Sequence, residues 1–165
     1  MQRAHRGRHR HDPQRDFVGF VVGDVSYAIA IRAVREVTLP LRVDRLPEAP
    51  PAVLGVADYR GAVVPVIDLR IRFGLGPSAE PRRQKWILLA VGGRLVALVV
   101  DRVSDVFGTG GSELRPAPPL GGGADVRGLA GVADFDGRMV FVLDVARFRE
   151  LTEHVSHSLR PGGSA

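Results

Sequence analysis

The sequence contains the same segment twice. GVADYRGAVVPVIDL, at Gly55–Leu69, recurs 76 positions later as GVADFDGRMVFVLDV, at Gly131–Val145, with eight of fifteen residues identical. A second pair has an offset of 69 residues: YAIAIRAVREV from Tyr27 matches VALVVDRVSDV from Val96. The chain is therefore an internal duplication of about 70–75 residues, which is too few copies for a solenoid. We expect two similar folding units.

Both units are expected to be built from β-hairpins. FVGFVVGDVSYAIAI alternates in hydrophobicity and is rich in Val, Ile, Phe and Tyr around the turn residues Gly23-Asp24, and WILLAVGGRLVALVV repeats this plan around Gly92-Gly93. Each hairpin is followed by a short edge segment, a linker rich in Pro or Gly, and a second hairpin. Short β segments at close spacing favour small barrels. Apolar residues three and four apart predict a C-terminal amphipathic helix over residues 145–159.

Composition excludes several classes of protein. The chain is 45% hydrophobic and 25% charged, which is a globular balance, and it has no cysteine for a disulfide, a thiolate zinc site or a nucleophile. No apolar run approaches the ~18 residues of a membrane span, so a soluble intracellular protein without membrane insertion is expected. The net charge is +5, of which residues 1–16 carry +3. These residues are interpreted as a disordered basic leader.

The polar residues do not form a recognisable active site. Asp58, Asp68, Asp134 and Asp144 could be paired acids, but each carboxylate recurs at the same place in both copies, as turn and strand-end residues do. His154 and His157 have a spacing that can share a metal, yet no third ligand is nearby in sequence. The expectation is no catalytic residue, no cofactor and no metal.

The duplicated motifs resemble the CheW-type chemotaxis coupling proteins. GVADYRGAVVPVIDLR, YAIAIRAVREV, VALVVDRVSDV, LRPAPP and GLAGVADFDGRMVFVLDV occur in the family's order and cover residues 17–151. The resemblance implies a mainly β fold with two five-stranded SH3-like barrels packed together and a C-terminal helix. We expect the halves at residues 17–75 and 84–145, with residues 152–165 forming the helix end and a flexible tail.

The resemblance also implies a function. Members of the family are non-enzymatic adaptors that join methyl-accepting chemoreceptors to the regulatory domain of the CheA histidine kinase. The adaptor would lie in the cytoplasm, in chemoreceptor arrays at the inner face of the membrane. The alternative is a β-barrel that binds nucleic acid or another protein. Single-strand binding needs exposed aromatic residues among basic ones, and most of the ten aromatic residues lie in apolar strands. No specific nucleic acid is therefore expected.

The two copies differ in their turn residues, and the first copy has Arg60 in its turn. Asp136-Gly137 in the second copy is a strong two-residue turn, whereas the first copy has Arg60-Gly61. Either Arg60 adopts a positive φ, or the loop has a bulge with only Gly61 there. The resemblance places Arg60 in a receptor-contacting groove. It implies receptor contacts and kinase contacts at the following residues: Val34, Glu36, Arg60, Gly55 and Val106 for the receptor, and Arg42 and Val43 for the kinase.

Overall fold

The computed structural model describes residues 12, 15–109, 114–117 and 128–158, with side chains up to residue 153. Most of the predicted leader and the predicted tail lie outside the described residues, and so do the side chains of the two C-terminal histidines. Within the described part, no helix is long and apolar enough to cross a membrane.

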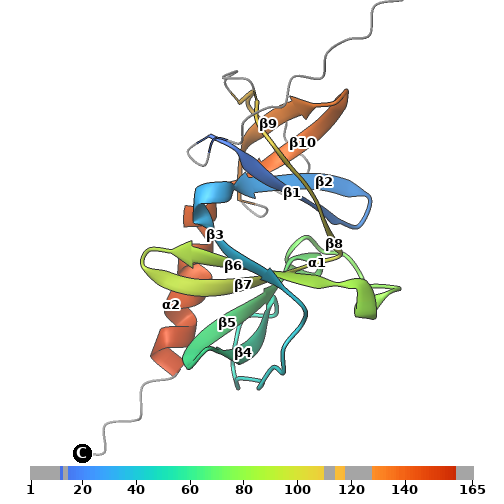
Figure 1. The fold of residues 1–165 in the computed structure, drawn as a ribbon. Helices are drawn as coiled ribbons and strands as arrows, with labels where there is room; N and C mark the ends of the chain where they lie inside the picture. The colour runs from blue at the N-terminus through green and yellow to red at the C-terminus, as the bar shows by residue number, and fades with distance from the viewer. Residues whose placement is uncertain (1–11, 13–14, 110–113, 118–127, 159–165) are drawn as a thin grey trace, which may run out of the picture.

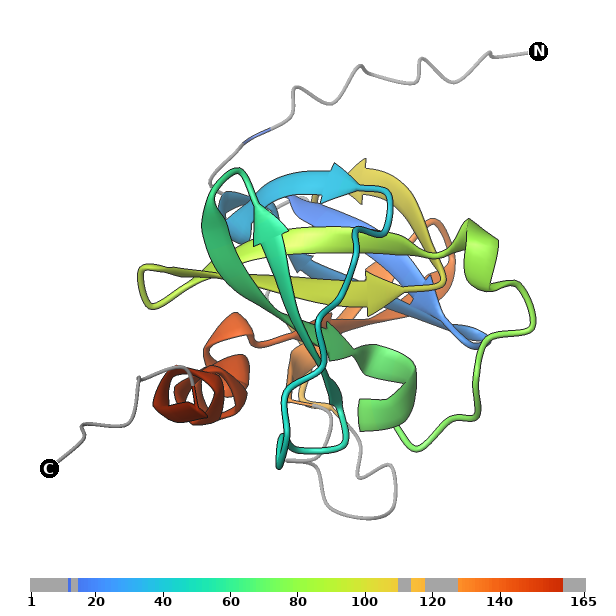
Figure 2. The same ribbon diagram turned by 90° about the horizontal axis from the view of Figure 1, so that it is seen from below.

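The described residues form ten strands with short helical segments (Figures 1 and 2). The predicted mainly β fold, with two five-stranded sheets and a C-terminal helix, is confirmed. The strands are β1 (Phe17–Val22), β2 (Val25–Ala30), β3 (Val34–Thr38), β4 (Val53–Tyr59), β5 (Ala62–Asp68), β6 (Lys85–Val91), β7 (Arg94–Val100), β8 (Arg102–Phe107), β9 (Leu129–Phe135) and β10 (Arg138–Leu143). The helical segments are η1 (Ile31–Ala33), α1 (Leu69–Arg72), η2 (Pro81–Arg83), η3 (Val145–Phe148) and α2 (Arg149–Ser158).

The two sheets do not coincide with the two halves of the sequence. One sheet has the order β8-β1-β2-β10-β9, and the other has the order β3-β6-β7-β5-β4. Each sheet therefore combines the first hairpin of one copy with the third strand and second hairpin of the other copy. In Figure 1 the two sheets lie one above the other. We call the first sheet barrel A and the second barrel B.

The expected division into halves at residues 17–75 and 84–145 is accordingly wrong as a description of the barrels. The duplication itself is borne out, because both sheets have the same order of equivalent strands. β2 pairs in parallel with β10, and β7 pairs in parallel with β5. A hairpin contributed by the other copy completes each sheet, so neither half of the sequence contains a complete barrel.

Each sheet curls until its two edge strands meet, which makes it a barrel. In barrel A the ring centroids of Phe107 in β8 and Phe135 in β9 are 4.4 Å apart in a stacked arrangement. In barrel B the Tyr59 hydroxyl in β4 donates a hydrogen bond to Glu36 in β3. Phe135 and Tyr59 occupy equivalent positions in the duplication. The same position therefore closes both barrels, through an aromatic contact in one and a polar contact in the other.

The hydrophobic core lies mainly between the barrels. Alternate residues of β6 face opposite sides: Ile87 and Leu89 belong to a shared cluster with side chains from both sheets, whereas Trp86 and Leu88 pack inside barrel B. A smaller cluster that includes Phe107 fills barrel A. Strands buried on both faces are expected to be continuously apolar rather than alternating. This explains the run WILLAV, which the hairpin interpretation alone does not require.

The C-terminal helix was expected over residues 145–159. The structure begins this segment with the 3-10 turn η3 and continues it as α2, which runs beside barrel B in Figure 1. Phe148 is fully buried and its ring lies 5.0 Å from the Arg72 guanidinium of α1. Burial lowers the pKa of Arg72. The helix therefore fastens to barrel B by an aromatic side chain and a cation–π contact.

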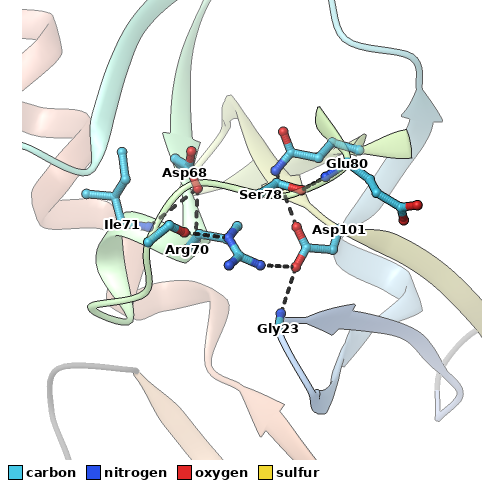
Figure 3. Close-up of polar contacts among 9 residues, drawn as sticks. Gly23, Asp68, Arg70, Ile71, Ser78, Glu80 and Asp101 are labelled. Carbon is cyan, nitrogen blue, oxygen red and sulfur yellow. Dashed lines mark hydrogen bonds and ion pairs between the residues drawn. The ribbon is translucent and has the colours of Figure 1, made fainter. Parts of the chain in front are cut away.

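A polar network around Asp101 connects the two barrels (Figure 3). The Asp101 carboxylate accepts a hydrogen bond of 2.7 Å from the backbone amide of Gly23, in the β1-β2 turn of barrel A. The same oxygen pairs at 2.6 Å with Arg70 of α1, which follows the last strand of the second hairpin in barrel B. The Gln84 side chain donates to the other carboxylate oxygen at 3.3 Å. The side chains of Asp101 and Arg70 are both more than four-fifths buried.

The linker before β4 crosses directly over Gly55. Asp44 and Val56 exchange backbone hydrogen bonds of 2.8 and 2.9 Å, which brings the linker backbone onto the strand. A Cβ atom on Gly55 would lie well inside van der Waals contact of the Asp44 carbonyl group, and the φ angle of Gly55 is 149°. Gly131 has the equivalent neighbour in the other copy, the Arg115 carbonyl oxygen. The glycine that opens both repeated motifs is therefore required by a close approach of two backbones.

We predict that Gly55→Ala lowers the free energy of unfolding by about 3 kcal/mol or more, because it adds a backbone clash to an unfavourable φ. Gly61→Ala is the matched control, since Gly61 also has a positive φ but nothing within 4 Å of a Cβ. The control should cost about 1 kcal/mol. Urea denaturation of both variants measures the difference, and equal losses would contradict the close-approach argument.

We predict that Asp101→Ala lowers the free energy of unfolding by about 3 kcal/mol, because it leaves a largely buried guanidinium without its partner. Asp134→Ala is the control: Asp134 pairs with Arg115 at 2.8 Å, but both side chains are more than half exposed. Its loss should cost less than about 1 kcal/mol. Denaturant melts of the two variants test this, and a loss for Asp101→Ala as small as that of the control would show that the network contributes little.

Candidate functional site

The turn between β4 and β5 holds Arg60 in a strained backbone conformation. Tyr59 pairs with Ala62, so the loop has two residues, with φ values of 50° at Arg60 and 83° at Gly61. Both angles are positive, as in a type I′ turn. The amide of Gly61 donates a 2.9 Å hydrogen bond to the Asp58 side chain. The bulge alternative is therefore wrong, and a bulky residue occupies a position that favours Asn, Asp or Gly.

Arg60 belongs to a three-residue cluster at the seam of barrel B. Its guanidinium lies 5.1 Å from the centre of the Tyr59 ring and 3.2 Å from the Glu36 carboxylate. The Tyr59 hydroxyl donates to the same carboxylate. Glu36 is half-buried, whereas the Arg60 side chain is 75% exposed. These contacts hold the guanidinium beside the barrel, while most of the Arg60 side chain remains open to a partner.

Two of the residues predicted from the sequence, Glu36 and Arg60, are thus brought together, and Tyr59 joins them. Tyr59 was not among the site residues predicted from the sequence. The available signal was its place beside Arg60 at a strand end, from which an aromatic ring can stack on a neighbouring guanidinium.

A shallow depression of about 450 Å³ adjoins the cluster. Arg35 of β3 and Arg94 of β7 line it together with Arg60, and Glu36 is the one acidic residue among its lining. Arginine therefore dominates the charge of this surface. Such a surface favours a partner segment that carries acidic side chains.

Exposed apolar side chains continue from the depression along β3 into the linker. Val37 is 40% exposed and Leu39 is 63% exposed, and Leu41 is also exposed. They are spaced two apart in an extended segment that contains Pro40, so they lie on one side of it. Exposed apolar residues rimmed by charged ones are typical of protein–protein contact surfaces. This segment was predicted from the sequence only as a linker, although the alternation VTLPLRV indicates an exposed apolar side.

The other predicted receptor residues lie apart from Arg60. Val34 is half-buried and packs against the core shared by the barrels. Gly55 is buried beneath the linker, where its role is structural. Val106 is 36% exposed but lies in β8, where it pairs with Val18 of barrel A. The structure thus places Val106 in the other sheet from Val34, Glu36 and Arg60.

The two predicted kinase residues have different environments. Arg42 is highly exposed and lies 3.4 Å from Asp44, whose side chain is also exposed. Val43 is half-buried and packs against the cluster inside barrel B. Val43 therefore anchors the linker, and Arg42 is the accessible member of the pair.

The repeated carboxylates have structural partners. Asp68 accepts hydrogen bonds from the amides of Arg70 and Ile71 at the start of α1 (Figure 3), and Asp144 caps η3 in the same way. Burial raises the pKa of Asp68, an effect that the two backbone hydrogen bonds oppose. Asp58 caps its own turn, and Asp134 pairs with Arg115. These contacts agree with the interpretation of the four residues as turn and strand-end residues.

No group of three or more potential metal ligands occurs among the described residues. The structure presents a cationic depression beside Arg60 and an exposed apolar strip that continues from β3 into the linker.

Comparison with known proteins agrees with this architecture. A CheW-like domain model matches residues 16–152. The chain is 34% identical over 139 residues to the chemotaxis protein CheW of Rhizobium meliloti, covering 84% of this chain and 89% of that protein. It is 33% identical over 132 residues to CheW of Klebsiella aerogenes, covering 80% of each.

A solved structure gives the same result in three dimensions. The scaffolding protein TtCheW of Thermoanaerobacter tengcongensis superposes with a TM-score of 0.71 at 27% identity, covering 79% of this chain and 89% of that one. The sequence motifs, the exchange of hairpins between the barrels and these similarities lead to one conclusion: the chain belongs to the CheW-like domain family and is a CheW-type chemotaxis coupling protein.

Proposed function

We propose that this protein is a non-enzymatic adaptor that links methyl-accepting chemoreceptors to a CheA-type histidine kinase at the inner face of the membrane. The observation that carries the proposal is the Glu36–Tyr59–Arg60 cluster. A strained backbone at Arg60 is retained where a turn of the same shape in the other barrel has Asp136. Strain of this kind clusters at functional sites, where binding depends on the side chain that it holds.

The receptor surface in this proposal is the depression beside Arg60 with the apolar strip of β3. The receptor tip would place apolar side chains on Val37 and Leu39, and an acidic side chain near Arg60 and Arg35. Val34 supports this strand from the shared core. Val106 lies in barrel A, so it would contact the receptor only if the tip reaches across both barrels. Gly55 acts indirectly, by letting the linker pass over β4.

The kinase surface in this proposal is the exposed side of the linker around Arg42, with Val43 holding the linker to barrel B. The regulatory domain of the kinase would then bind close to the receptor surface but not on it. Two modest interfaces on one small protein place the kinase against the receptor, and repetition in an array adds multivalency.

A nucleic-acid-binding role finds no support among the described aromatic residues, because none of them is fully exposed. Trp86, Phe20 and Tyr27 are buried in the core. The basic leader lies mostly outside the described residues. The observations therefore favour protein partners over single-stranded nucleic acid.

We predict that the protein raises the autophosphorylation rate of a cognate CheA-type kinase in the presence of a receptor cytoplasmic fragment, and that Arg60→Asp reduces this stimulation at least fivefold. The charge reversal should repel both Glu36 and an acidic receptor segment. Asp136→Arg is the matched control, because it reverses a charge at the equivalent turn of barrel A. Equal effects of the two variants on the rate, with native circular dichroism, would remove Arg60 from the receptor surface.

We also predict that Arg60→Asn separates binding from stability. Asparagine tolerates a positive φ better than arginine, and the exposed ion pair with Glu36 contributes little. The free energy of unfolding should stay constant or rise by up to about 1 kcal/mol, while receptor affinity falls at least fivefold. Denaturant melts and binding to the receptor fragment measure the two effects. A clear loss of stability would show that Arg60 supports the fold instead.

A further inference from the structure

The hairpin exchange relates each strand of one barrel to a strand of the other, and backbone contacts fix the match after the second hairpins. Asp68 accepts a 2.8 Å hydrogen bond from the amide of Arg70, and its counterpart Asp144 accepts a 3.0 Å hydrogen bond from the amide of Ala146. The amides of Asp68 and Asp144 also donate to equivalent carbonyl oxygens, at 2.8 and 2.7 Å. The surroundings of the Asp101 network can therefore be compared with the equivalent place in barrel A.

At that place the side chains are reversed in charge or shortened. With an offset of 69 residues, Arg32 stands where the network has Asp101. With an offset of 76 residues, Ala146 stands where the network has Arg70. The carboxylate has become a guanidinium, and the partner guanidinium has become a methyl group. The ion pair that fills the junction on one side cannot form on the other.

A cavity of about 810 Å³ lies where the network is missing. Its lining joins η1, the end of β6 and the β10-η3 junction, so it adjoins both barrels. Most of the lining side chains are apolar, and many of these are small: Ala30, Ala33, Ala90, Ala130, Val142, Val145 and Ala146. A volume of this size is in the range of small-molecule sites, which are mainly apolar with a few polar groups that fix orientation.

Two arginines and two aspartates line this cavity, so its formal charges balance. Arg32 and Arg15 both line it, and both residues are exposed. Arg15 is the counterpart of Gln84 in the network. Neither guanidinium makes an ion pair or a hydrogen bond with the described residues.

The two aspartates in the lining each accept a hydrogen bond from a backbone amide. The Asp16 carboxylate accepts a 2.8 Å hydrogen bond from the amide of Asp12. The Asp144 carboxylate caps η3 through the amide of Ala146. Each carboxylate therefore has a backbone partner, whereas neither guanidinium has a partner among the described residues, so the unpaired charge in the lining is positive and suits an anionic group.

We propose that this cavity binds a small amphipathic carboxylate: one negatively charged head on an apolar body. The head pairs with Arg32 and Arg15. The ligand thus brings the carboxylate, which in the network comes from the side chain of Asp101. The apolar body packs on the alanine and valine side chains, in the volume that the missing arginine side chain leaves open. None of its lining residues belongs to the Glu36–Tyr59–Arg60 cluster, although Ala90 lines both this cavity and the depression beside Arg60.

The test uses sodium octanoate as the probe and 1-octanol as its uncharged control. Each is titrated into the full-length protein and followed by NMR. We expect saturable shifts centred on Ala33, Ala90 and Ala146 with octanoate, and binding at least tenfold weaker with octanol. Arg32→Ala should weaken octanoate binding about tenfold, the effect of losing one charge-assisted contact. Arg82→Ala, which removes an exposed arginine of η2, should leave the affinity unchanged.

A second variant rebuilds the missing ion pair. Arg32→Asp combined with Ala146→Arg copies the Asp101–Arg70 arrangement, and should abolish octanoate binding by filling the cavity. If this variant does not fold, Arg32→Ala with a native thermal melt decides alone. Equal binding of octanoate and octanol, unchanged affinity in Arg32→Ala, or shifts that do not saturate would each overturn the proposal.

Discussion

The shared apolar core between the two barrels is the contact on which the rest of the structure depends. Side chains from both sheets meet there, including the fully buried Phe20 and Tyr27 of barrel A and Ile87 and Leu98 of barrel B. Their strands also face a barrel interior, so they are apolar on both sides. Neither sheet could expose this face to water without losing a large part of its hydrophobic stabilisation. The barrels are therefore two units in architecture and one unit in folding.

The sequence predicted the hairpins because their information is local. Alternating apolar residues around Gly23 and Gly92 specify strands and turns within a few residues. Which copy supplies each third strand is not local information. The segments after Val34 and after Val103 have the same pattern, so either could pair with either hairpin. The exchange is decided by the chain's path through the shared core. For that reason the predicted strands were right and the predicted halves were wrong.

The candidate site was predictable to a similar degree. The unequal turns pointed to Arg60, and the resemblance added Glu36, which the structure places 3.2 Å from it. Their contact depends on barrel closure, which brings β3 to β4 across the seam, and no short-range pattern specifies it. The resemblance also named Gly55 without a physical reason; the reason is the Asp44 backbone crossing above it. Tyr59 was not predicted as a site residue, because an aromatic side chain in a strand usually packs in the core.

Because of the duplication, each strand and turn of one barrel has a counterpart in the other. The counterparts share their backbone conformation but differ in the chemistry of their surface side chains. At the turns, both copies keep a positive φ, but one has Asp136, which suits that conformation, and the other has Arg60, which does not. At the junctions, Asp101 joins the barrels through Gly23 and Arg70, whereas its counterpart Arg32 borders an open cavity. A single network suffices to fasten two barrels that already share a core. The fold therefore does not require an ion pair at the counterpart, and the positions that break the symmetry of the chain are where binding chemistry is to be sought.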